Sequence, residues 1–137
     1  MKWIGSGRKA IALVLCALLL FPLLVSCKEE EDLTVHTLDL ESSFLTNVND
    51  GDNHKLYLKA EVSVEVISAA HFEKLQTRIH EVQDIILGEL RLLTRDDVYD
   101  PIIQETLKPI LVEKLRDGLG LDISNVYFRS FVAQQNK

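Results

Sequence analysis

Cysteine is scarce in this chain, and basic residues are scarce in most of it. The cysteines are Cys16 and Cys27, so the chain after residue 27 has no pair to oxidise and no disulfide framework. Three of the 15 Lys and Arg residues lie in the first nine positions, which leaves 12 against 21 Asp and Glu in the rest. Phosphate backbones and anionic lipids are bound chiefly through Lys and Arg. We therefore expect no nucleic-acid partner.

Signatures of catalysis and cofactor binding are also missing from the sequence. No Ser lies in a Gly-x-Ser-x-Gly elbow, and no glycine-rich phosphate loop follows a predicted strand. The aspartates of residues 49–53 resemble a calcium loop without its closing Glu, which favours a plain turn. The histidines lack short ligand spacing, so surface positions are favoured over a metal site; they are His36, His54, His71 and His80. We therefore expect that the protein is not an enzyme and has no catalytic residue, metal site or cofactor. The weakest alternative is a hydrolase with an unrecognised site.

The first 26 residues have the layout of an export signal. Three cations precede the apolar run from Ala10 to Val25, and a stretch of acidic residues begins at Glu29. Positive charges stay on the cytoplasmic side of a membrane, so the chain after Cys27 is expected outside the cytoplasm. This gives three predicted parts: a signal or anchor at 1–26, a charged spacer at 27–37, and one small domain at 38–137.

Two kinds of membrane anchor fit this N-terminal segment. Residues 24–27, Leu-Val-Ser-Cys, resemble a lipoprotein signal, in which the Cys27 thiol takes a diacylglyceryl group before the preceding peptide bond is cut. The alternative is an uncleaved transmembrane helix, because an apolar run of about 16 to 18 residues is at the short end of what a bilayer requires. Lipidation of Cys27 is the favoured hypothesis. Either anchor tethers the domain to the membrane.

Strict alternation of apolar and polar residues marks residues 56–67 as a strand. Every second residue from Leu56 to Val66 is apolar, and the residues between them are mostly polar. A polar turn cluster at 49–53 precedes this strand, and weaker strand-like sequence lies at 34–46. The pattern predicts a β-hairpin.

Two helices are predicted to follow the hairpin. Apolar residues recur at steps of three or four over 72–93, which indicates one long helix, and Gly88 within it is a candidate for a close packing contact. A polar break at 94–100 leads to a second helix that begins at Asp100-Pro101 and ends at Gly118 or Gly120. Pro109 is expected to kink or divide it. Its apolar positions are Ile103, Leu107, Ile110 or Leu111, and Leu115.

The acidic residues of the polar break have two interpretations. Asp96, Asp97 and Asp100 could be paired carboxylates for acid–base chemistry. The favoured interpretation is that they cap and solvate a helix start, because Thr94 and Asp97 have the spacing of a capping box.

Residues 126–134 are predicted to form a strand that closes the sheet. Simple alternation places Phe128 on one face and Tyr127 with Phe131 on the other. With helices on one side of the sheet, only one face is covered. We expect Phe128 in the core, and Tyr127 with Phe131 exposed as a contact surface.

Three segments of this pattern resemble the FliL family of flagellar basal-body-associated proteins. They are the strand at 56–66, the helix end at 84–94 and the final Val-Tyr-Phe-Arg-Ser-Phe-Val-Ala-Gln at 126–134. The resemblance spans residues 38–134 and includes the order strand, long helix, polar break, second helix and strand. Two features depart from the family pattern: the lipoprotein-like Cys27, and the break at 95–101, which lacks a Gly-Lys step.

This resemblance implies an α+β fold similar to the stomatin-type domain, with a β-hairpin, two helices and a closing strand. It also implies an inner-membrane protein whose domain faces the periplasm as part of the flagellar basal body. Its expected partners are flagellar stator and basal-body proteins and further copies of itself, in a non-catalytic role that supports swimming or swarming. The alternative function is that of a periplasmic lipoprotein with a scaffolding or ligand-binding role unrelated to the flagellum.

Overall fold

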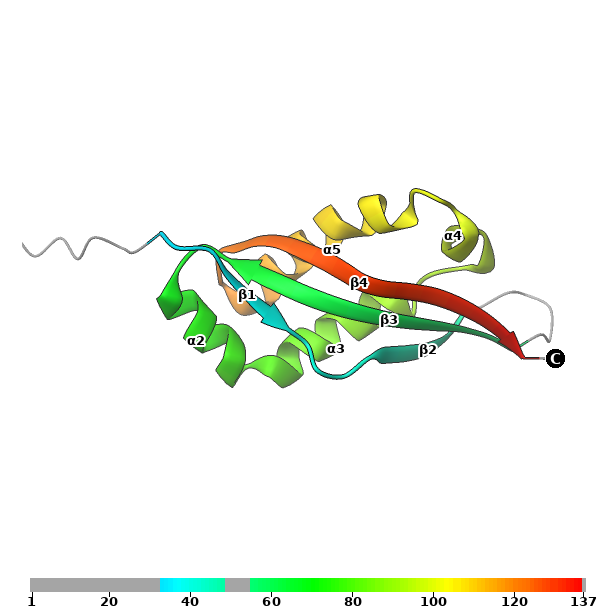
Figure 1. Ribbon diagram of the computed structural model, residues 1–137, viewed down its shortest axis with the longest axis horizontal. Coiled ribbons are helices and arrows are strands. Elements are labelled where there is room, and N and C mark those ends of the chain that lie inside the picture. Colours follow the sequence, from blue (N-terminus) through cyan, green and yellow to red (C-terminus); the bar gives the residue numbers. More distant parts are fainter. Residues whose placement is uncertain (1–32, 49–54, 137) are drawn as a thin grey trace, which may run out of the picture. The chain divides into compact units, whose positions relative to one another are not determined.

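A computed structural model describes residues 33–48 and 55–136, which form an antiparallel sheet with helices packed against it (Figure 1). This confirms the predicted α+β class. The elements are β1 (His36–Asp39), β2 (Phe44–Val48), β3 (Lys55–Val66), α2 (Ala69–Thr77), α3 (Ile79–Leu90), α4 (Arg95–Tyr99), α5 (Ile103–Leu119) and β4 (Ile123–Asn136). Because β1 begins at His36, residues 36 and 37 of the predicted spacer are paired with β3.

The sheet is organised around β3, which has a partner on each edge. On one edge β4 pairs with it from Lys55 to Val66. On the other edge β1 pairs with residues 63–66 and β2 with residues 56–60, so these two short strands lie end to end. The antiparallel pairing of β2 with β3 agrees with the predicted hairpin, whose turn at 49–53 lies outside the described residues.

The alternation predicted for β3 is confirmed by burial. The even-numbered residues of this strand are all 2% exposed or less, and they form one face of the sheet: Leu56, Leu58, Ala60, Val62, Val64 and Val66. Buried residues of the helices pack against this face, including Leu75, Ile86 and Leu111. We call this helix-covered side the inner face of the sheet and the opposite side the outer face.

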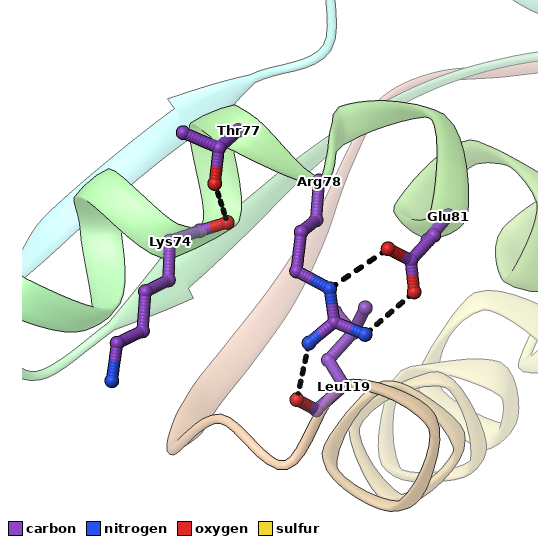
Figure 2. Close-up of polar contacts among 5 residues, drawn as sticks. All are labelled: Lys74, Thr77, Arg78, Glu81 and Leu119. Carbon is purple, nitrogen blue, oxygen red and sulfur yellow. Dashed lines mark hydrogen bonds and ion pairs between the residues drawn. The ribbon is translucent and has the colours of Figure 1, made fainter.

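The single long helix predicted over 72–93 is wrong, because the chain breaks at Arg78 into α2 and α3 (Figure 2). Arg78 has φ −111° and ψ 27°, outside helical geometry. The carbonyl of Lys74 accepts hydrogen bonds from both the Arg78 N–H (3.2 Å) and the Thr77 hydroxyl (2.9 Å). Such back-bonding by Thr competes with the helical pattern. The apolar spacing continues across the break, so periodicity could not detect it.

The Arg78 side chain joins this break to the end of α5. Its Nε and Nη2 donate to the two carboxylate oxygens of Glu81 at 2.9 and 2.5 Å, and Nη1 donates to the Leu119 carbonyl at 2.6 Å (Figure 2). The Glu81 hydrogen bond raises the pKa of Arg78, and the same bond lowers the pKa of Glu81. A cation on a terminal helix carbonyl also complements the helix dipole. One side chain therefore connects α2, α3 and α5.

The polar break contains the short helix α4, which the sequence analysis did not predict. Its capping box is confirmed: the Thr94 N–H donates to Asp97 Oδ2 at 2.8 Å, and the Asp97 N–H donates to Thr94 Oγ1 at 3.4 Å. These bonds to Thr94, with the backbone bond the larger cause, lower the pKa of Asp97. Asp100 Oδ1 accepts from the Ile102 N–H at 3.0 Å. The cap interpretation of Asp97 is therefore confirmed. The prediction that Asp100 is the N-cap of the second helix is wrong, because Ile102 has that position and no side chain caps it.

The second predicted helix, α5, begins at Ile103 and not at Pro101. It continues through Pro109 to Leu119, so proline does not divide the helix, and a kink at Pro109 stays a prediction. Pro109 is exposed, on the side of the helix away from the core. The end of the helix is as predicted, because Gly120 takes the left-handed conformation (φ 64°) and its N–H donates to the Arg116 carbonyl.

Simple alternation fails in β4, because a β-bulge interrupts its pairing with β3. Ser130 pairs with Glu61, but the next pair is Phe128 with Val62, so Arg129 is the extra residue. Phe131 pairs with Ala60, and it therefore lies on the inner face together with Phe128. Their rings meet edge to face at 5.3 Å. The prediction that Phe131 is on the outer face is wrong, whereas Tyr127 is exposed as expected.

Within residues 33–48 and 55–136, no helix is both long and apolar enough to cross a membrane. The segment for which an anchor is predicted, residues 1–26, lies outside this range.

Candidate functional site

The outer face of the sheet is the candidate contact surface. Its residues are those of β3 between the buried even positions and their neighbours on β1, β2 and β4. Figure 1 shows the sheet in front of α3 and α5, with the outer face turned toward the viewer. We define this outer face by Asp39, Leu45, Tyr57, Lys59, Glu61, Ser63, Glu65, Tyr127, Ser130 and Val132.

Exposed apolar side chains lie on this face beside charged ones. Leu45 on β2 and Val132 on β4 both pair with Lys59, so the lysine lies between two apolar side chains. Leu45 is 65% exposed and Val132 is 44% exposed. Lys59 also lies 3.9 Å from the Glu61 carboxylate. This part of the outer face therefore presents both apolar and charged atoms to solvent.

The bulge in β4 directs a side chain across the sheet. Arg129 Nη2 donates to the Leu40 carbonyl at 2.8 Å, and Nη1 lies 3.7 Å from the Asp39 carboxylate. Both partners are at the end of β1, on the far edge of β3 from Arg129. The guanidinium therefore connects β4 to β1 over the middle strand, as bulges commonly re-aim a side chain.

A polar network continues along the outer face from Arg129. The Ser63 hydroxyl donates to Asp39 Oδ1 at 2.6 Å. The Glu65 carboxylate accepts from the Ser124 hydroxyl at 2.6 Å and from the Tyr127 hydroxyl at 2.9 Å. These hydrogen bonds fix the orientation of side chains on three strands. They order a surface, and Ser63, at 3% exposed, is not open to a substrate.

The described histidines lie away from the outer-face network. The His36 ring stacks on Phe72 with centroids 5.3 Å apart. His71 Nδ1 accepts from the Asp122 N–H at 3.2 Å, and His80 is exposed on α3. Among residues 33–48 and 55–136, no group of three His, Cys, Asp or Glu residues could hold a metal ion. His54, the turn at 49–53 and Cys27 lie outside the described residues.

A concave feature with a volume of about 620 Å³ lies between α5 and the start of β4. Its lining carries both signs of charge, and the Lys108 ammonium contacts the Glu105 carboxylate at 2.6 Å. Arg116 Nε donates to the Ile123 carbonyl at 2.7 Å. The Arg116 bond joins the end of α5 to the start of β4, whereas the Lys108–Glu105 pair lies within α5. The lining residues are Glu105, Lys108, Pro109, Val112, Glu113, Arg116, Ser124 and Asn125.

The role of Arg129 is the feature of this surface that sequence reasoning missed. The relevant sequence feature is that Phe128 and Phe131 are three residues apart, and both cannot lie on one face of a regular strand. The spacing is compatible either with opposite faces in a regular strand or with one face and a bulge between them, and the sequence does not decide between the two.

Comparison with known proteins gives one family. The family model described as flagellar basal body-associated protein FliL matches residues 37–134. A comparison with curated proteins gives no match. The matched range begins within β1 and ends near the end of β4, so it contains the whole outer face.

Proposed function

Because the chain belongs to the FliL family of flagellar basal body-associated proteins, we propose that it is a non-catalytic scaffold that supports the stator of the flagellar motor. The family is a flagellar accessory family and not a known enzyme family. The observation that carries this proposal is the match over residues 37–134. This range includes most of every strand and the outer face, which no helix within residues 33–48 and 55–136 covers (Figure 1).

The outer face supports a contact role because its side chains are held in place by hydrogen bonds that do not involve the hydrophobic core. Arg129, Ser63 and Glu65 use their hydrogen bonds to orient side chains on the side of the sheet without helices. Exposed Leu45 and Val132 lie beside this network. A rigid surface loses little entropy on binding, which favours recognition of a specific partner. We propose that stator or basal-body proteins bind here.

The proposed location is the inner membrane, with the domain in the periplasm. This proposal is supported by the export-type leader, its three cations, and the acidic residues that follow Cys27. Lipidation of Cys27 is the favoured anchor, and an uncleaved helix is the alternative. A labelled fatty acid should be incorporated into the wild type and not into a Cys27→Ala variant. An intact Met1 N-terminus with an unmodified Cys27 would favour the helix.

Self-association is proposed as part of the scaffold role. The 14-residue edge strand β4 carries one charged residue, Arg129, and no proline, and such edges favour pairing with another chain. Sedimentation of the full chain in detergent should show assembly that increases with concentration. A monomer at every concentration would contradict this part of the proposal.

The partner can be tested by photo-cross-linking in living cells. A photoreactive amino acid at Val132 should capture a stator or basal-body protein, identified by mass spectrometry. The matched control is Ile110, which is 37% exposed on α5, away from the outer face. Capture of a motor protein from Val132 and not from Ile110 would support the proposal that partners bind the outer face.

A different result would support another function. Equal capture of motor proteins from both positions would contradict the assignment of this face. Capture of envelope proteins unrelated to motility, together with normal swimming of a deletion strain, would favour the periplasmic lipoprotein.

A further inference from the structure

The end of the domain where the chain enters β1 is unusually poor in charge. Residues 33–38 are Leu-Thr-Val-His-Thr-Leu, and residues 66–72 are Val-Ile-Ser-Ala-Ala-His-Phe. Neither segment contains Asp, Glu, Lys or Arg, although these residues make up 26% of the chain. The two segments lie side by side, because His36 pairs with Val66. We call this region the entry end.

Apolar side chains project into solvent at the entry end. Leu33 is 70% exposed, Val35 is 62% exposed and Ile67 is 39% exposed. Val35 and Ile67 directly adjoin the last pair of β1 with β3, on neighbouring strands. The exposed apolar surface is therefore continuous across two strands and not scattered.

The opposite end of the domain provides a comparison. Leu92, Tyr99 and Ile102 are also exposed there, by 73%, 54% and 61%, around α4 (Figure 1). Charged residues are interspersed among them: Arg91, Arg95, Asp96, Asp97 and Asp100. Exposed apolar atoms among charges are normal on a soluble surface. The entry end differs because neither of its two segments contains a charged residue, although the Asp122 carboxylate lies beside it, 3.7 Å from His71 Nδ1.

The length of the preceding chain restricts what the entry end can meet. The apolar run ends at Val25, and Leu33 follows after seven residues. Eight Cα–Cα steps span at most about 30 Å even when fully extended. If the apolar run lies in a bilayer, Leu33 cannot be farther than this from it. The nearest apolar phase is then the lipid.

We propose that the entry end binds the outer surface of the membrane that holds the N-terminal anchor, with Leu33, Val35 and Ile67 in the headgroup region. This inference rests on the proposed membrane anchor, either a lipid on Cys27 or the uncleaved apolar run before it. Apolar side chains gain by leaving water at this interface. Because Asp122 adjoins this end and residues 29–32 are acidic, a zwitterionic headgroup layer suits the contact better than an anionic one. The contact would orient the sheet relative to the bilayer, which a flexible spacer alone could not do.

Depth-dependent fluorescence quenching tests this proposal on the full chain. The background is Trp3→Phe with Cys27→Ser, which removes the native tryptophan and keeps the leader attached. The chain is reconstituted in phosphatidylcholine vesicles that contain brominated phosphatidylcholine. An Ile67→Trp variant should be quenched severalfold more strongly than an Ile102→Trp variant, which places the probe among exposed apolar residues at the opposite end.

A third reporter separates the two proposals. A Leu20→Trp variant reports whether the apolar run lies in the bilayer. Quenching of this variant together with equal, weak quenching of the Ile67→Trp and Ile102→Trp variants would overturn the inference and leave the anchor intact. Absence of quenching in both the Leu20→Trp and the Ile67→Trp variants would overturn the inference and the helix anchor, and lipidation of Cys27, which this background lacks, is tested by the labelled fatty acid.

A charge introduced at the entry end provides a second measurement. With the probe in a Val35→Trp variant, Ile67→Asp should remove most of the quenching, and Ile102→Asp should leave it unchanged. Circular dichroism shows whether each variant keeps its helices and strands. Equal quenching after both substitutions would mean that Ile67 does not contribute to the lipid contact, and it would overturn the proposed role of the exposed apolar surface.

Discussion

The two faces of the sheet are formed by the same strands but are held by different interactions. On the inner face, the side chains of β3 are buried and make apolar packing contacts, as Val62 does beside its pairing partner Phe128. On the outer face, Ser63, Glu65 and Arg129 are held by hydrogen bonds across three strands. The bulge makes this division possible in β4, because one extra residue returns Phe131 to the inner side and aims Arg129 to the outer side. Side chains under the helices must fill the space between the layers without gaps. Polar side chains on the outer face must have hydrogen-bond partners in the protein or in water.

The largest expected difference between the two sides is in stability. Leu111 is fully buried in α5 against the inner face, and Leu45 is 65% exposed on the outer face. Leu111→Ala should lower the free energy of unfolding by about 2–5 kcal/mol, because it removes apolar contacts and leaves a cavity. Leu45→Ala should change it by less than about 0.5 kcal/mol. Urea unfolding of both variants measures this, and similar losses would break the comparison.

The assignment of both phenylalanines of β4 to one face can be tested next. Phe128→Ala and Phe131→Ala should each cost about 1–3 kcal/mol, below the value for a fully buried ring because both are half-buried. Their edge-to-face contact predicts a coupling of about 0.5–1.5 kcal/mol in a double-mutant cycle. A coupling of zero, with one variant as stable as the wild type, would place the rings on opposite faces and remove the bulge.

The helices also differ in how closely their surfaces are packed, and two glycines, Gly88 and Gly118, show this difference. A Cβ at Gly88 would meet nothing within 4 Å, whereas one at Gly118 would lie 2.7 Å from Ile85 Cδ1. The expectation of a close contact at Gly88 is therefore wrong, and Gly118 is the residue with the close contact. Gly88→Ala should stabilise the protein by up to about 1 kcal/mol through helix propensity. Gly118→Ala should gain less or destabilise, because Ile85 must move. Thermal unfolding compares the two, and a larger gain at Gly118 would contradict this packing.

The smallest expected effect concerns pH at the exposed junction of α2 and α3. The hydrogen bond from Arg78 lowers the pKa of Glu81 in the folded protein. A group with a lowered folded pKa stabilises the fold above its unfolded pKa, and this contribution disappears as pH falls through the folded value. Glu81→Gln should therefore be slightly less stable than the wild type at neutral pH, and the difference should vanish in acid. Urea midpoints across this pH range measure it, and a difference that grows in acid would contradict the assigned interaction.

The sequence by itself determined the features that depend on local periodicity and local hydrogen bonding. The alternation from Leu56 to Val66 predicted a strand with one buried face. The capping box was predictable because Thr94 and Asp97, which form it, are only three residues apart. Gly120 ended α5 because few other residues accept its positive φ. Each of these is decided within one or two turns of chain, so a single sequence contains the information.

Only the tertiary structure decided where those periodicities are interrupted. The break at Arg78 is stabilised by the Leu119 carbonyl, 41 residues away, and the bulge at Arg129 by the Leu40 carbonyl, 89 residues away. Apolar spacing is the same on both sides of Arg78, so it predicts a continuous helix. The face on which Phe131 lies depends on its pairing with β3 and not on its position in β4. Partners distant in sequence determine these choices, because the energy that favours them appears only when the elements pack together.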